Sequence, residues 1–99
     1  MDALPKAAQE LLQVAESAGW KSGVERGVDS GGSPFVTVAV GARSGERFWH
    51  YQITWHTRGT GTYRLFGKIV RTDVHYWCDA PSLRTIRETI AANSLTNVR

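Results

Sequence analysis

Cysteine is nearly absent from this chain of 99 residues, in which Cys78 is the only one. A single cysteine excludes an internal disulfide and a zinc site built from several cysteines. No apolar run approaches the roughly 18–20 residues that a transmembrane helix needs. The segment from Met1 to Lys6 also lacks the basic region and apolar stretch of a secretion signal. These absences predict a soluble chain that stays in the cytoplasm.

The chain also has only a small excess of positive over negative charge. Twelve Lys and Arg against nine Asp and Glu give a formal net charge of +3, which permits nucleic-acid binding but is far from the strongly basic balance of a DNA-coating protein. Nine of the basic residues are arginine, whose planar side chain suits phosphates and carboxylates. A GC-rich genome accounts for the arginine content equally well. The composition, 41% hydrophobic and 21% charged, indicates one globular domain over residues 1–99.

Helical spacing of apolar residues occurs at both ends of the chain. The first apolar stripe consists of Leu4, Ala8, Leu11, Leu12, Ala15 and Ala18. Gly19 stands where a left-handed helix end belongs, and Trp20 follows it, so we expect a helix over residues 5–18. Near the C-terminus, a helix start at Pro81 and Ser82 predicts a second helix over 81–93. A flexible tail is expected over 94–99.

Alternation of side-chain character between the helices predicts strands. We expect them over residues 24–28, 35–43, 47–58 and 62–71, with a further short edge strand at 74–78. Gly59-Thr60-Gly61 is typical of a three-residue hairpin loop. That loop length places Arg58 opposite Thr62, Trp55 opposite Leu65, and Tyr51 opposite Ile69, whereas a two-residue loop would mix the two faces.

The order of elements predicts an α+β fold, a two-layer sandwich in which both helices cover one face of an antiparallel sheet of three to five strands. The covered face is expected to carry Trp49, Tyr51, Ile53, Trp55, Tyr63, Leu65 and Ile69. The opposite face, which we call the open face, has no helix over it. Because burial follows this division, the tryptophans of residues 47–58 should be buried, and His50 and His56 should be exposed.

The open face collects basic and hydrogen-bonding side chains with one aromatic ring. Such sheet surfaces can stack bases and follow phosphates, although an ordinary solvated sheet face has a similar composition. The residues predicted to bind nucleic acid are Arg43, His50, His56, Arg58, Arg64, Phe66 and Lys68. Little sequence specificity is expected, since nothing is typical of a recognition helix.

The edge strand suggests a second kind of partner. Trp77 shares a face of the expected strand with His75, opposite Val74 and Tyr76, so either this segment is not a regular strand or Trp77 is exposed. The alternative is that the second helix or the end of the chain covers it. An exposed Trp near Arg71 and His75 suits a protein interface, and the same edge strand predicts self-association into a homodimer. The alternative function is therefore a protein-binding module that uses Arg71, His75 and Trp77.

Signals for metal binding and catalysis are poor. His50 and His56 share a face but lie about 20 Å apart along a strand, and His75 and Cys78 are expected on opposite faces. No pair of carboxylates is placed for acid–base chemistry. We expect no enzyme activity, no metal site and no cofactor.

Two resemblances add to these expectations. The order of elements resembles the double-stranded RNA-binding domain, which grips phosphates with a lysine-rich start of its second helix; here that start is Pro81-Ser82-Leu83-Arg84-Thr85-Ile86-Arg87, in which only Arg84 and Arg87 are basic. Residues 54–66 (TWHTRGTGTYRLF), residues 32–38 (GSPFVTV) and the helix end Ala18-Gly19-Trp20 are similar to segments of small uncharacterised accessory proteins of actinobacteriophages, of the mycobacteriophage type. This second resemblance implies a phage protein that acts inside a bacterial host cell, and it implies no site residues.

Together these features predict a non-enzymatic phage accessory module that contacts nucleic acid through its open sheet face. The alternative is a module that binds and modulates a host protein.

Overall fold

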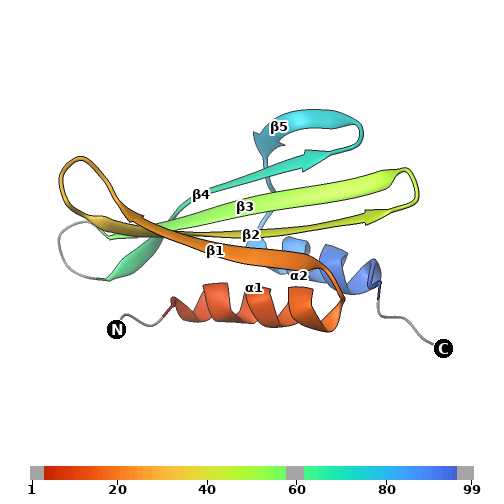
Figure 1. The fold of residues 1–99 in the computed structure, drawn as a ribbon, viewed down its shortest axis with the longest axis horizontal. Helices are drawn as coiled ribbons and strands as arrows, with labels where there is room; N and C mark the ends of the chain where they lie inside the picture. Colours follow the sequence, from red (N-terminus) through yellow and green to blue (C-terminus); the bar gives the residue numbers. More distant parts are fainter. Residues whose placement is uncertain (1–3, 58–61, 96–99) are drawn as a thin grey trace.

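The structure is a computed structural model that describes residues 4–57 and 62–95. Its elements are α1 (Lys6–Ser17), β1 (Lys21–Val28), β2 (Pro34–Ser44), β3 (Arg47–Thr57), β4 (Tyr63–Thr72), β5 (His75–Asp79) and α2 (Leu83–Ala92) (Figure 1). The five strands form one antiparallel sheet in the order β1-β2-β3-β4-β5. The predicted α+β class, with its order of helix, sheet and helix, is confirmed. Arg58, the loop at 59–61 and residues 96–99 of the predicted tail lie outside the described residues.

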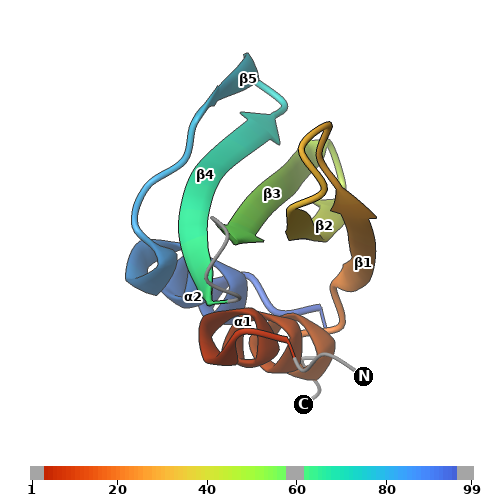
Figure 2. The ribbon, with the colours of Figure 1, turned by 90° about the vertical axis from the view of Figure 1, so that its left-hand side faces the viewer.

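Both helices lie against the same side of the sheet (Figures 1 and 2). Their apolar stripes meet the alternate residues of β2 and β3 that point to that side, as the period-2 pattern requires. The buried core consists of Ala8, Leu11, Ala15, Ala18, Trp20, Val36, Val38, Val40, Trp49, Tyr51, Ile53, Trp55, Val70, Ile86 and Ile90. Neither helix in the described ranges is long and apolar enough to cross a membrane.

The end of α1 is fixed by Gly19 and Trp20. Gly19 has a φ of 77°, the left-handed conformation that glycine adopts at little cost. The backbone N–H of Trp20 donates to the carbonyl of Ala15 at 2.9 Å. The Trp20 ring then stacks on Trp49, with the ring centroids 5.5 Å apart, and its Nε1 donates to the carbonyl of Asn93 at 3.1 Å. One residue thereby joins the end of α1, the sheet and the end of α2.

The predicted register of β3 and β4 is correct only near the hairpin. Trp55 pairs with Leu65, as predicted, and Thr57 pairs with Tyr63. The next pair is Thr54 with Gly67, so Phe66 is one extra residue, as in a β-bulge. A bulge reverses the side on which every later residue of its strand lies.

Several predicted positions in β4 are therefore wrong. Tyr51 pairs with Val70 rather than with Ile69, and Val70 is the buried residue while Ile69 is 37% exposed. Leu65 keeps its predicted partner but is 45% exposed, because α1 lies on the same side of the sheet but packs against β1 and β2, away from β4. Lys68 pairs with Ile53, a core position, so it does not lie on the open face.

The sheet is curved across its width. Viewed along the strands, β5 stands above β4 and away from the helices (Figure 2). Its pairing with β4 is irregular, with a register shift between Val70 and Thr72. The open face is consequently concave, with β1 along one side and β5 along the other.

Candidate nucleic-acid interface

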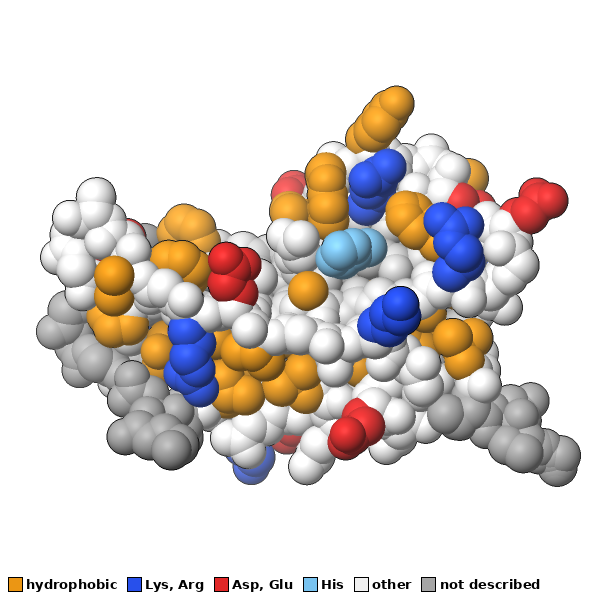
Figure 3. All heavy atoms as spheres, in the orientation of Figure 1, with side chains coloured by type: hydrophobic (Ala, Val, Ile, Leu, Met, Phe, Trp, Pro, Cys, Tyr) orange, Lys and Arg blue, Asp and Glu red, His pale blue; other side chains and the backbone are white. Residues whose placement is uncertain are grey.

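The strand register brings basic residues together at one end of the open face. Residues paired across a sheet point to the same side, and one row crosses four strands as Lys21, Gly41, His50 and Arg71. The Lys21 and Arg71 cations stand at the two ends of this row, with Gly41 and His50 between them. Lys and Arg side chains and a histidine gather on this face between β1 and β5 (Figure 3).

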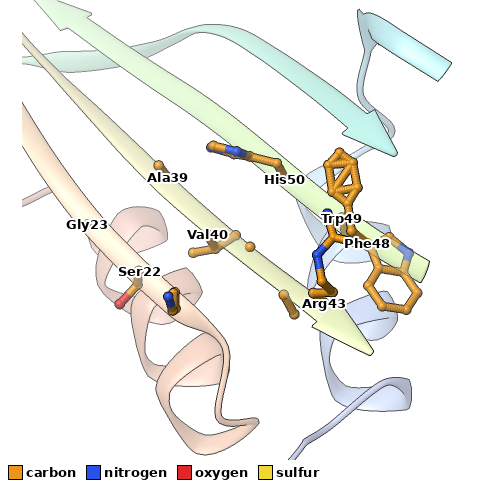
Figure 4. Close-up of a pocket in the computed structure, with 11 residues that line it drawn as sticks. Ser22, Gly23, Ala39, Val40, Arg43, Phe48, Trp49 and His50 are labelled. Atoms are coloured by element: carbon orange, nitrogen blue, oxygen red, sulfur yellow. The ribbon is translucent and has the colours of Figure 1, made fainter. Parts of the chain in front are cut away.

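A hollow of about 460 Å³ lies beside this row. Its floor includes Gly23, Ala39 and Gly41, and Arg43 and His50 stand beside it (Figure 4). A Cβ at Gly41 would lie 3.0 Å from the backbone oxygen of Trp49, so glycine allows β2 and β3 to approach closely here. None of the residues that line the hollow, all of them described, is acidic. The hollow therefore presents positive charge over a floor of small residues.

Phe48 holds two of the cations in place. The Cζ atom of Arg43 lies 5.3 Å from the centroid of the Phe48 ring, and that of Arg71 lies 5.6 Å from it. Guanidinium groups that stack on a ring in this way keep their N–H groups available for phosphate oxygens. Both arginines are exposed, so their charges are accessible to a ligand.

Trp77 contacts this cluster from β5. Its ring meets the His50 ring edge to face, with the centroids 5.3 Å apart, and 42% of Trp77 is exposed. The prediction left open whether Trp77 is covered; it lies over the open face and α2 does not bury it. A partly exposed indole beside basic side chains can stack on a base or on an aromatic group of a partner.

The opposite end of the open face is different, because His56 is paired there. Its Nε2 lies 2.9 Å from Oδ2 of Asp29, and its side chain is only 19% exposed. The Phe35 and Phe66 rings flank it, with centroids at 6.4 and 5.6 Å, and its Nδ1 has no hydrogen-bond partner in the described structure. The prediction that His56 is exposed is therefore wrong, because its side chain is mostly buried and its Nε2 contacts the carboxylate of Asp29.

Asp29 is itself held by the turn between β1 and β2. Its Oδ1 accepts hydrogen bonds from the backbone N–H groups of Gly31 and Ser33, each at 2.9 Å. The Ser33 N–H is the largest cause that lowers the pKa of Asp29 from its ordinary value; Gly31 and His56 lower it further, and partial loss of water opposes them. The ionised carboxylate thus organises this turn.

We expect the stability of the chain to fall in acid in part because of Asp29. A carboxyl group whose pKa is lowered by folding contributes stability that is present above its unfolded pKa, about 3.9, and is lost as the pH falls through the lower folded value. Asp29→Asn keeps the shape and removes the ionisation. Urea unfolding at several pH values between about 5 and 2 should therefore show a steeper loss for the wild type than for Asp29→Asn. Parallel curves would contradict this role.

The predicted nucleic-acid residues do not form one surface. Arg43 and His50 lie together by the hollow, whereas Arg64 and Phe66 lie at the opposite end beside His56. Lys68 is on the helix side, and Arg58 is outside the described residues. Arg71 and Trp77, predicted for a protein partner, join the cluster by the hollow instead, and His75, exposed on β5, lies with its Nδ1 3.4 Å from Oγ1 of Thr72.

Sequence reasoning missed Lys21 and Phe48. Phe48 is two residues from His50 in the predicted strand 47–58, so both side chains point to the same face. Its position on the open face could therefore have been predicted from the alternation of the strand. Lys21 was missed because β1 begins three residues before the predicted strand, where Ser22 and Gly23 have low strand propensity. No group of three or more His, Cys, Asp or Glu that could hold a metal ion occurs in the part of the chain that the structure describes.

We name the cluster of Lys21, Arg43, Phe48, His50, Arg71 and Trp77 the basic cluster. It combines fixed positive charge, a hollow with a small-residue floor and a partly exposed indole ring. Phosphate groups and aromatic bases fit these features. Comparison of the chain with family models, curated proteins and solved structures finds no match.

Proposed function

We propose that the chain is a non-enzymatic module that binds nucleic acid through the basic cluster on its open face. The observation that carries this proposal is the row Lys21–Gly41–His50–Arg71, which flanks a hollow without acidic lining. Positive side chains of this kind neutralise phosphates, which supply most of the affinity of such contacts. The resemblance to phage accessory proteins adds the bacterial host cell as the setting.

Single-stranded nucleic acid fits this surface better than a duplex. Two partly exposed rings are available to unpaired bases: Trp77 beside His50, and Phe66, 64% exposed, beside His56. The two histidines are six residues apart on β3, a distance of about 20 Å, so a bound strand would span several nucleotides between the rings. A stacked base contributes about 1–3 kcal/mol, whereas a duplex keeps its bases away from the rings.

The double substitution Arg43→Ala and Arg71→Ala is expected to weaken binding of a labelled single-stranded oligonucleotide at least tenfold. Three permanently charged groups serve phosphates in the wild type, which implies a slope of about −2 for log affinity against log salt. One such group remains in the variant, so the slope should fall to about −0.7. Fluorescence anisotropy at several salt concentrations measures both quantities.

Lys68→Ala with Arg84→Ala provides the matched control. It removes the same net charge from the helix side of the sheet and from the exposed face of α2. The control should bind like the wild type and retain its salt slope. Equal losses in the two variants would mean that net charge alone attracts the oligonucleotide, and absence of wild-type binding at low salt would refute the function.

A second candidate function is docking on another protein through Arg71, His75 and Trp77. The observation in its favour is the exposure of β5, where Tyr76 is 86% and Val74 is 73% exposed. Tyr76→Ala separates the two functions, because Tyr76 is not part of the basic cluster. Loss of a stoichiometric, nuclease-resistant host partner in Tyr76→Ala, with oligonucleotide binding unchanged, would favour this second function.

A further inference from the structure

The two edges of the sheet differ in regularity. β5 is short and its register with β4 is broken between Val70 and Thr72, and such irregularity at an edge hinders the addition of another strand. β1 pairs with β2 without a shift from Lys21–Gly41 to Val28–Pro34. Its other edge carries no strand among the described residues. Of the two edge strands, β1 is therefore the one whose regular backbone can pair with an additional strand.

Apolar surface is exposed along this edge. Val24 and Val28 point to the helix side, since Val24 pairs with the core residue Val38, yet they are 43% and 64% exposed. Hydrophobic atoms gather between β1 and α1 on the face that Figure 3 presents. The apolar side of the sheet thus extends to its β1 edge, where these two valines remain partly exposed to solvent.

We propose that two copies of this chain associate through β1, in an antiparallel pairing centred on Val24. Opposed residues must point to the same side, so a two-fold axis passes through a residue position. Centred on Val24, the pairing extends from Lys21 opposite the second copy's Gly27 through all seven residues to Gly27. Val24 then lies opposite the second copy's Val24, and each covers the apolar surface that the other leaves exposed.

The charges and the length of β1 together select this register. In it, Glu25 lies opposite the second copy's Gly23 and Lys21 opposite its Gly27, so neither of these two side chains lies directly opposite a bulky or like-charged residue. On this face two diagonals join Lys21 of one copy to Glu25 of the other and are attractive, whereas one diagonal joins the two Glu25 residues and is repulsive. The diagonal charges are therefore attractive on balance. A pairing centred on Glu25 would set two carboxylates against each other, and one centred on Gly23 would pair only five residues, because the chain turns into α1 before Lys21.

The association continues the sheet from five strands to ten and keeps both open faces on the same side, because the axis is perpendicular to the sheet. Two basic clusters would then lie on one surface. This inference does not depend on the proposed function, since its test measures mass and cross-linking rather than oligonucleotide binding.

Sedimentation equilibrium of the full chain from micromolar to millimolar concentrations tests the association. The wild type should approach twice the chain mass of 11.0 kDa. Val24→Asp and Val24→Lys each set like charges on the axis, and each should weaken the dimer at least tenfold. An equimolar mixture of the two variants should restore it, because Asp and Lys then face each other. Val74→Asp, on an exposed residue between β4 and β5, should leave the dimer unchanged.

Disulfide cross-linking checks the register. In a Cys78→Ser background, Val24→Cys places one thiol from each copy within about 5 Å, measured between Cβ atoms, and should form a covalent dimer under mild oxidation. Gly23→Cys in the same background should not. Circular dichroism establishes that each variant is folded. A wild type that stays monomeric, a dimer that survives Val24→Asp, a mixture that does not associate, or cross-linking through position 23 instead of 24 would each overturn the proposal.

Discussion

Trp20→Ala is expected to lower the free energy of unfolding by about 3–5 kcal/mol, the range for removal of a buried tryptophan. Trp20 is 4% exposed, and its ring stacks on Trp49 and on Tyr51, with centroids 5.5 and 6.3 Å away. The substitution leaves a cavity between α1, α2 and the sheet, and it removes the hydrogen bond to the carbonyl of Asn93. Urea unfolding followed by circular dichroism measures the change.

Two further variants separate the causes. Trp20→Phe retains an aromatic ring but loses the N–H donor, so it should cost less than Trp20→Ala and more than a typical surface substitution. Trp77→Ala removes the same side chain from a position that is 42% exposed, and it should cost much less. If the two alanine variants were equally destabilised, Trp20 would not join the two layers.

The fold class could be predicted from the sequence because its signals are local. The helical spacing of Ala8, Leu11 and Ala15 identified α1, and the glycine at its end fixed where it stops. Strict alternation in β3 placed Trp49 and Trp55 in the core, where both are buried. These features depend on neighbours within a few residues, so they can be recognised in the sequence.

The register beyond Phe66 could not be predicted in this way. Apolar residues occur at both parities after the bulge, since Ile69 and Val70 are adjacent, and either of them can face the core without breaking the pattern. The choice is made by packing against β3, which is a long-range contact. One extra residue in β4 therefore moved Lys68 to the helix side and Arg71 to the open face.

The type of candidate site, a basic surface on the open face, was predicted, but its position on that face was not. A basic open face was expected along the whole sheet, and Asp29 divides it, because its carboxylate reaches His56 from the turn between β1 and β2. Asp29 is 27 residues from His56 in the sequence, so no local sequence pattern predicts their contact. The charges that remain accessible gather at the other end, where Lys21 and Arg71 come from strands separated by two others.

Ile53→Ala is expected to lower the free energy of unfolding by about 2–5 kcal/mol, because it removes a fully buried side chain from the middle of β3. Ile53→Val should cost only about 0.5–1.5 kcal/mol. Gln52, the preceding residue, points to the open face, and Gln52→Ala should change stability by about 0.5 kcal/mol or less. Urea unfolding of the three variants measures the difference between the two faces of one strand.

The same comparison on β4 tests the bulge at Phe66. Val70 is 7% exposed and lies opposite Tyr51, whereas Ile69 is 37% exposed and lies opposite Gln52. Val70→Ala deletes two buried methyl groups, at about 0.8 kcal/mol for each group plus the cavity that they leave, so a loss of about 2 kcal/mol is expected. Ile69→Ala deletes a larger side chain but should cost about 1 kcal/mol or less, because much of that side chain is already in water. The reverse order of the two losses would restore the uninterrupted register, in which Ile69 faces the core and Lys68 returns to the open face.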